Sequence, residues 1–159
     1  MRLVTMEPKK CVGCRNCEYA CSYNNNGTCD SKQSNIQVNF YPKEGVCIPL
    51  TCMHCDEAWC LNVCPAAAIS RNEEGAVLVD QSRCAGCKMC MLACPYGNIH
   101  FDTAKQVSRK CNLCGDEEPN CVNHCIATAL NYEEVEDMDA GRGAFDTIIV
   151  KKLQDGGDQ

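Results

Sequence analysis

Short runs in which apolar and polar residues alternate are the main structural pattern along this chain of 159 residues. Ile36, Val38 and Phe40 alternate with polar residues, and this period of two predicts a strand over Asn35–Tyr41. The same reasoning predicts further short strands at Arg2–Glu7, Gly45–Pro49, Ala76–Val79, Asn98–Asp102 and Phe145–Lys152. None of these runs is long, so we expect small sheets.

The predicted helices are also short. Each is expected to begin near the third cysteine of one of four cysteine groups, as in Cys90–Cys94. The segment Asn24–Gly27 is predicted to be a turn, Asp137–Gly143 a loop and Gln154–Gln159 a disordered tail. The expected fold class is therefore α+β, built from short strands and short helices.

Composition shows that an aliphatic core is not the main source of stability. Leu, Ile, Val and Phe are sparse, whereas eighteen residues are cysteine. Metal ligation is the expected substitute, because binding at a site absent from the unfolded chain contributes folding free energy. Disulfides are the alternative, but they need an oxidising compartment, and Met1–Glu7 shows no apolar signal region. We therefore expect a cytoplasmic protein whose cysteines bind metal.

Sixteen of the cysteines form four groups along the chain. The groups are Cys11, Cys14, Cys17 and Cys21; Cys52, Cys55, Cys60 and Cys64; Cys84, Cys87, Cys90 and Cys94; and Cys111, Cys114, Cys121 and Cys125. The other two, Cys29 and Cys47, lie outside every group and are expected to be plain structural thiols.

The spacing within the groups points to iron–sulfur clusters. The third group, with Pro95 directly after it, matches the bacterial ferredoxin run C-x2-C-x2-C-x3-C-P at every position. The first group has the same spacing, and the other two lengthen only the gap before the third cysteine. Structural zinc, the alternative, is typically bound by paired C-x2-C units separated by a longer spacer. Four such groups therefore predict four [4Fe–4S] clusters.

In a ferredoxin run the fourth cysteine binds the neighbouring cluster. The second and third groups are close in sequence, so we expect them to exchange fourth cysteines and the outer groups to do the same. The predicted ligand sets are Cys11, Cys14, Cys17 and Cys125 (cluster 1); Cys111, Cys114, Cys121 and Cys21 (cluster 2); Cys52, Cys55, Cys60 and Cys94 (cluster 3); and Cys84, Cys87, Cys90 and Cys64 (cluster 4). This predicts two ferredoxin-like modules, an inner one over 46–103 nested in an outer one over 1–45 and 104–159.

Two motifs resemble a known family. With Cys52-Met-His-Cys55 and Arg109-Lys110-Cys111, the segment from Leu3 to Asn131 resembles the four-cluster iron–sulfur electron-transfer subunits of the dimethyl sulfoxide reductase beta-subunit type. That family includes small subunits of formate dehydrogenases, formate hydrogenlyase and some tungsten aldehyde oxidoreductases. Its nested cluster pairing agrees with the pairing given above. Ile126 departs from the proline often found after the last cysteine.

The resemblance implies an electron-transfer component, not a catalytic enzyme, and a role in anaerobic metabolism. The implied partner is a tungsten or molybdenum pterin subunit, an aldehyde oxidoreductase or a formate dehydrogenase being favoured over a hydrogenase or a carbon monoxide dehydrogenase. Similar subunits also join further electron-transfer subunits or stack into filaments, which this sequence does not itself indicate. A free-standing, diffusible polyferredoxin is the alternative. The net charge of −6 argues against nucleic acid, and no apolar run is long enough for membrane insertion.

A few residues beside the cysteines are candidates for tuning the clusters. Each predicted cluster already has four thiolates, so we expect hydrogen-bonding or packing roles for His54, His100 and His124. Lys88 and Lys110 adjoin ligand cysteines, where a positive charge raises a reduction potential, but solvated side chains are the expectation. Trp59 is expected to pack over the cluster beside Cys60.

Overall fold

A computed structural model of the chain describes residues 1–115 and 117–135. All eighteen cysteines fall within these residues. The predicted loop Asp137–Gly143, strand Phe145–Lys152 and tail Gln154–Gln159 lie outside them.

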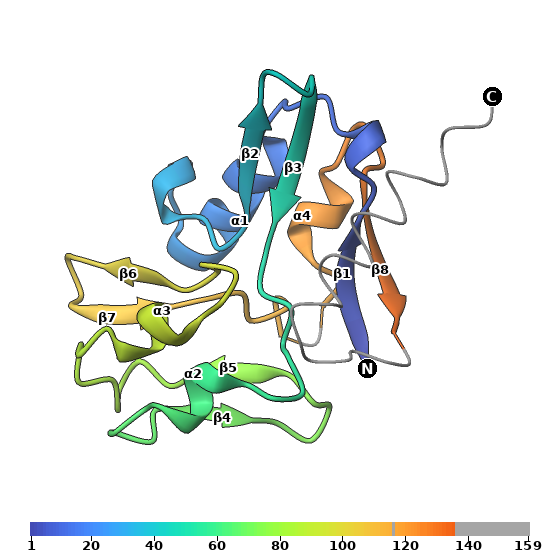
Figure 1. Ribbon diagram of the computed structural model, residues 1–159. Helices are drawn as coiled ribbons and strands as arrows, with labels where there is room; N and C mark the ends of the chain where they lie inside the picture. The colour runs from blue at the N-terminus through green and yellow to red at the C-terminus, as the bar shows by residue number, and fades with distance from the viewer. Residues whose placement is uncertain (116, 136–159) are drawn as a thin grey trace.

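Four two-stranded antiparallel sheets make up the strand structure of the described residues (Figure 1). They are β1 (Arg2–Met6) with β8 (Leu130–Glu134), β2 (Gln37–Tyr41) with β3 (Val46–Leu50), β4 (Ile69–Arg71) with β5 (Val77–Val79), and β6 (His100–Asp102) with β7 (Val107–Arg109). Isolated two-stranded hairpins are marginally stable in water. Each sheet therefore depends on what packs against it.

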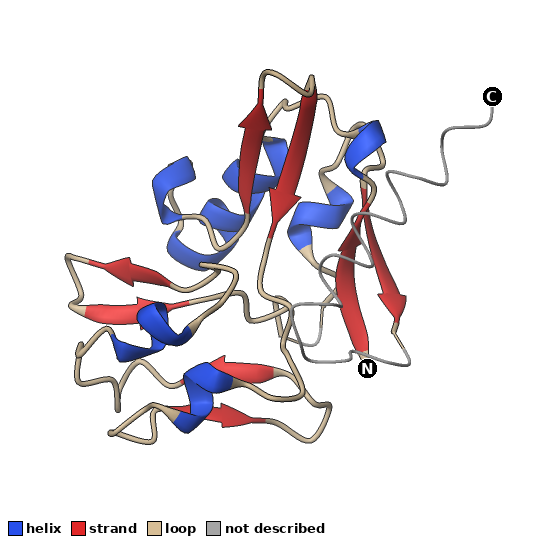
Figure 2. Cartoon of the chain, in the orientation of Figure 1, coloured by secondary structure: helices blue, strands red, loops and turns tan. Residues whose placement is uncertain are grey.

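The helices occupy the expected places. They are α1 (Asn16–Asn26), α2 (Trp59–Asn62), α3 (Met89–Ala93) and α4 (Asn120–Asn123), with short 3-10 turns η1 (Pro8–Lys10) and η2 (Ser31–Gln33). Each α-helix begins one residue before the third cysteine of its group, as Met89 precedes Cys90. Together with the predicted strands, this confirms a small mixed fold of helices and strands (Figure 2).

The predicted turn at Asn24–Gly27 is wrong, because α1 continues through Asn26. Asparagine has a low helix propensity, but here tertiary contacts override it. The Asn25 side chain donates to the Cys21 carbonyl at 2.8 Å, and the Asn26 side chain donates to the Gln33 carbonyl at 3.2 Å. Gly27 then ends the helix with φ +69°, a conformation that glycine adopts without steric cost.

Strands β1 and β8 join the two ends of the described chain. They pair with Val4 opposite Tyr132 and Met6 opposite Leu130 (Figure 1). The alternation pattern predicted none of the strands β4, β7 and β8. The run of polar residues in β8 shows little alternation, and only the pairing with buried β1 defines this strand. This sheet holds the segment after the fourth cysteine group against the segment before the first.

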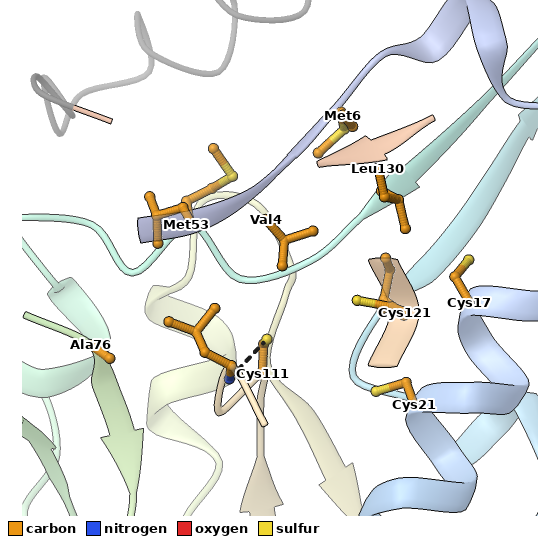
Figure 3. Close-up of a cluster of buried hydrophobic side chains, with 12 residues drawn as sticks. Val4, Met6, Cys17, Cys21, Met53, Ala76, Cys111, Cys121 and Leu130 are labelled. Carbon is orange, nitrogen blue, oxygen red and sulfur yellow. Dashed lines mark hydrogen bonds between the residues drawn. The ribbon is translucent and has the colours of Figure 1, made fainter. Parts of the chain in front are cut away.

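Buried hydrophobic residues form two separate clusters. The larger one lies between β1, β8, α1 and α4 and includes Cys17, Cys21, Cys111 and Cys121 among its members (Figure 3). The smaller one contains Cys90 with Ala58, Ile69, Val77 and Ile99. The helices follow the same division, since α1 packs on α4 and α2 packs on α3.

The predicted module boundaries fall inside two hairpins. Strands β2 and β3 pair across residue 45, and β6 and β7 pair across residue 103. Groups one and four are thus neighbours, as are groups two and three, while short hairpins connect the two regions. The division at 45 and 103 stays a prediction.

Arg109 connects these regions through its guanidinium, which is buried together with the rest of the residue. It donates to the carbonyls of Lys32, Gln33 and Ser34 at 2.6, 3.0 and 2.6 Å, and to Asn35 Oδ1 at 2.8 Å. Hydrogen bonds from an ionised donor are stronger than neutral ones, and the planar fork of arginine can reach several acceptors at once. This contact fixes the loop between α1 and β2 against β7.

We predict that Arg109→Lys destabilises the fold by about 2 kcal/mol, because an ammonium group cannot replace the forked contacts. The measurement is the guanidinium concentration at which the anaerobic holoprotein loses its visible absorbance. Arg83→Lys is the matched control, since Arg83 is exposed. Equal midpoints for the two variants would contradict a structural role for Arg109.

Candidate iron–sulfur sites

All four cysteine groups begin with the same backbone bend. The residue before the second cysteine has a positive φ in each group, at Gly13 (68°), His54 (48°), Gly86 (67°) and Leu113 (55°). This bend turns backbone N–H groups toward the first sulfur. His54 N lies 3.4 Å from Cys52 Sγ, and Leu113 N lies 3.4 Å from Cys111 Sγ.

A second bend follows the last cysteine of groups two and four. Ala67 and Thr128 have φ of 47° and 48°, and the next backbone N–H donates back to the cysteine sulfur. Ala68 N lies 3.3 Å from Cys64 Sγ, and Ala129 N lies 3.2 Å from Cys125 Sγ. Hydrogen bonds to sulfur stabilise negative charge and raise the reduction potential of a bound cluster. The same backbone bend and the same N–H to sulfur hydrogen bond thus occur in both groups.

One cavity brings together thiols from groups two and three. Its lining includes Cys52, Cys55, Cys60 and Cys94. A second cavity is lined by the complementary set, Cys64, Cys84, Cys87 and Cys90. Each cavity thus receives three thiols from one group and the fourth from the other, because α2 packs directly on α3.

Thiols of the outer groups also lie together. Burial raises the pKa of Cys17 to about 12, and the thiolates of Cys11 and Cys125 are among the charges that raise it further. Burial likewise raises the pKa of Cys121 well above its usual range, with added contributions from the thiolates of Cys111 and Cys21. Figure 3 shows Cys17 and Cys21 on α1 beside Cys121 on α4.

These donor sets fit [4Fe–4S] clusters. Across residues 1–115 and 117–135, no three Cys, His, Asp or Glu side chains converge closely enough to hold a single metal ion. All eighteen cysteines are free thiols. Buried thiols with raised pKa values do not ionise by themselves, and ligation by iron supplies the missing stabilisation of the thiolate. The assignment of individual ligands stays a prediction.

The comparisons with known proteins identify the family. A 4Fe-4S dicluster domain model matches residues 44–135, and a 4Fe-4S binding domain model matches residues 8–24. The chain belongs to the 4Fe–4S electron-transfer subunit family. It is an electron-transfer component of oxidoreductase systems, as predicted, and its relatives are named as such components and not as catalytic enzymes.

Two relatives illustrate the membership. A putative electron transport protein, YsaA of Escherichia coli K12, is 40% identical and the match covers 89% of this chain and 95% of the relative. The thiosulfate reductase electron transfer subunit PhsB of Salmonella typhi is 34% identical, with 86% and 77% covered. Among solved structures, a chain of the BamBC active-site complex of benzoyl coenzyme A reductase shares the fold, with a TM-score of 0.51, 21% identity and coverage of 100% and 98%.

Several residues expected to tune the clusters take clear positions in this electron-transfer subunit. His54 is buried, and its Nδ1 accepts the Val77 N–H at 3.0 Å, which is the expected hydrogen-bonding role. Burial, followed by the charge of Lys110, lowers the pKa of His54 to about 3. Trp59 lines the cavity beside Cys60 but is 61% exposed, so the expectation of a packed ring is only partly met.

The two lysines beside cysteines differ from each other. Lys88 is exposed and lies over the Phe101 ring, 4.3 Å from its centroid, as a solvated lysine can. Lys110 is buried, so the expectation of a solvated side chain is wrong there. Adjacent sequence gives no signal of this difference, because burial comes from strands β5 and β7 and from the loop of the second group.

The cysteines outside the groups lie near the first site. Cys29 is exposed and lines a groove between α1 and α4 with Tyr19, Tyr23 and Ile126. Cys47, on β3, lies so close to Gly13 that a Cβ there would come within 2.8 Å of its Sγ. The expectation that both are plain structural thiols stays a prediction.

Ser108 also contributes to the sites, although no pattern in the sequence predicted it. Its backbone N–H lies 3.4 Å from Cys84 Sγ, and its hydroxyl lies 3.2 Å from Cys90 Sγ. Ser108 is buried on β7, well beyond its cysteine group in sequence. Only the hairpin β6–β7 brings it over the third group.

Among the described residues, the structure contains no helix with the length and apolar character needed to cross a membrane.

We predict that Gly86→Ala removes one cluster, lowering the iron content by about a quarter. A Cβ at Gly86 would lie 2.6 Å from the Gln106 carbonyl oxygen, a backbone atom that cannot easily move. Gly97→Ala is the matched control, because Gly97 has nearly the same φ but nothing within 4 Å of a new Cβ. Iron analysis and visible absorbance measure the outcome: full iron in Gly86→Ala would contradict the prediction, and an equal loss of iron in both variants would show that backbone strain alone matters.

Removal of iron should unfold most of the chain, because the small sheets and short helices bury few aliphatic residues without it. Treatment with a chelator and an oxidant, followed by far-ultraviolet circular dichroism and limited proteolysis, tests this. Retention of the holoprotein spectrum and protease resistance after complete iron loss would contradict it.

Proposed function

We propose that the chain binds four [4Fe–4S] clusters and passes electrons through them in the order 1–2–3–4. The observation that carries this proposal is the cavity lined by Cys52, Cys55, Cys60 and Cys94, which combines three thiols of one group with the fourth of another. The predicted ligand sets of the other three clusters follow the same rule. When bound, each such cluster accepts and donates one electron.

Contacts between the ligand sets support the linear order. Cys17, assigned to cluster 1, raises the pKa of Cys121, assigned to cluster 2, although burial is the main cause of that rise. Cys52 of cluster 3 similarly raises the pKa of Cys111 of cluster 2, after burial. Electrostatic influence of this kind requires proximity. The packing of α2 on α3 then joins cluster 3 to cluster 4.

The nested modules follow from the same assignment. Groups one and four would form the outer module with β1 and β8, and groups two and three the inner module with β4 and β5. Each exchange of a fourth cysteine would crosslink two distant segments through iron. Such crosslinks would offset the low aliphatic content of the chain.

Both ends of the proposed path reach the surface. Cys14 of the first group and Cys87 of the third group are exposed. Exposed apolar residues lie near the cysteines of both predicted end clusters: Val12 and Ile126, which adjoin Cys11 and Cys125, are 68% and 71% exposed, and Leu92, in the third group, is 89% exposed. Apolar surface of this kind is typical of protein–protein contacts. This favours a subunit docked at both ends over a freely diffusing ferredoxin.

The proposed partner is a catalytic subunit with a tungsten or molybdenum pterin centre, such as an aldehyde oxidoreductase or a formate dehydrogenase. Relatives named as subunits of thiosulfate reductase and sulfite dehydrogenase support a catalytic partner of this general kind. Purification of the chain under anaerobic conditions from its own cells, with a tag at one end, tests the idea. Elution with a catalytic subunit is expected, and elution as a lone monomer would favour the diffusible alternative.

Alanine substitutions test the exchange of fourth cysteines. Cys94→Ala should abolish the same cluster signal as Cys60→Ala, and not the signal lost in Cys90→Ala. Each variant should lose about four of about sixteen iron atoms. Electron paramagnetic resonance of the reduced protein identifies the missing signal, and Cys29→Ala and Cys47→Ala serve as controls that keep all four. If Cys94→Ala and Cys90→Ala lose the same signal, each group binds its own cluster and the exchange is wrong.

A further inference from the structure

Lys110 is a buried cation beside a proposed cluster. The residue is 5% exposed, and its ammonium group donates a hydrogen bond to the Val77 carbonyl on β5. A lysine is almost never buried to this extent without a compensating partner, because a carbonyl dipole alone does not offset the loss of hydration. A negative charge close to the ammonium group is therefore needed to stabilise it in this buried position.

That negative charge is available in the cavity of the second group. Lys110 lines this cavity together with the thiols of Cys52, Cys55, Cys60 and Cys94. Burial raises the pKa of Cys60 to about 11, and the charge of Lys110 is the largest influence that lowers it. Burial and the neighbouring thiolates raise the pKa of Cys55, and the charge of Lys110 opposes that rise. The ammonium group thus faces the site at which four thiolates would gather.

Other charges near this cavity are more exposed to solvent. Arg71 donates to the carbonyls of Cys55 and Asp56 at 2.6 and 2.8 Å, but it does so from the exposed side of the loop. Glu57 also lines the cavity and is exposed. Water and salt screen exposed charges, whereas a buried charge acts through a medium of low dielectric constant. Lys110 therefore dominates the local field.

We propose that the buried charge of Lys110 raises the reduction potential of the cluster in this cavity and so favours the presence of an electron at this step of the path. The inference rests on the proposed function. In the step itself, a neighbouring cluster is oxidised by one electron and this cluster is reduced by one, while no bond forms or breaks. The added negative charge is stabilised by the adjacent ammonium group.

Lys110→Gln tests the proposal in the holoprotein. Glutamine keeps a hydrogen-bond donor for the Val77 carbonyl but removes the charge. In redox titrations followed by electron paramagnetic resonance, one of the four midpoint potentials should fall, with a change on the order of tenfold in the one-electron equilibrium constant. The signal that shifts most should be the one that is missing from Cys60→Ala, and the other three potentials should change less.

Lys88→Gln is the matched control, since it removes an exposed lysine that also adjoins a cysteine. Its potentials should remain those of the unaltered protein. Four unchanged potentials in Lys110→Gln with full iron content would overturn the proposal. If Lys110→Gln loses iron, Lys110→Arg decides: full iron with normal potentials supports the role of charge, whereas iron loss or a lowered potential there overturns it.

The proposed function fails in a different way. It fails if the unaltered protein binds fewer than four clusters, or if Cys60→Ala and Cys94→Ala remove different signals. A shift in one potential in Lys110→Gln would still show an electrostatic role for Lys110 at whichever cluster carries that signal. The two ideas can therefore be judged separately.

Discussion

The convergence of buried thiols from distant segments is the constraint on which this structure depends. Cysteines are members of both hydrophobic clusters, where other proteins place aliphatic side chains. Burial raises the pKa of thiols such as Cys17 and Cys111 to about 12, so the polypeptide alone does not favour their ionised forms. Iron–sulfur ligation would reverse that preference, and cluster binding and folding are then one equilibrium.

Polar contacts hold the segments that carry these thiols. Arg109 fixes the loop before β2, and in that loop the backbone N–H of Asn35 donates to Cys21 Sγ at 3.3 Å. Glu18, buried on α1, accepts the Val38 N–H at 2.7 Å and forms an ion pair with Arg15 at 2.9 Å. The Val38 contact thereby joins the ligand-bearing helix α1 to β2, and Arg15, directly before the helix, compensates the charge of Glu18. These contacts position sulfur atoms as well as stabilise the fold.

Electrostatics then distinguishes sites that have the same ligands. Four thiolates and their iron carry net negative charge, and the chain itself is acidic, with a formal charge of −6. Several cysteine groups have backbone N–H groups that point at sulfur, and these stabilise the negative charge in a similar way at each site. Of the two cavities lined by four group cysteines, only the one with Cys52, Cys55, Cys60 and Cys94 is also lined by the buried Lys110, which gives that site a different environment. Differences in potential along a path of chemically identical clusters can arise in this way.

The sequence by itself determined the cofactor class, the family and the start of each α-helix among the described residues, because cluster ligation requires a local spacing of cysteines that can be read directly from the sequence. It also predicted the strands with alternating residues. It did not predict the short strands β4 and β7. It also did not predict β8, the length of α1, or the contributions of Ser108 and Arg109, since these depend on tertiary contacts. The burial of Lys110 was likewise decided only by tertiary structure, because the residues that cover its side chain come from distant parts of the chain, such as Val77 on β5.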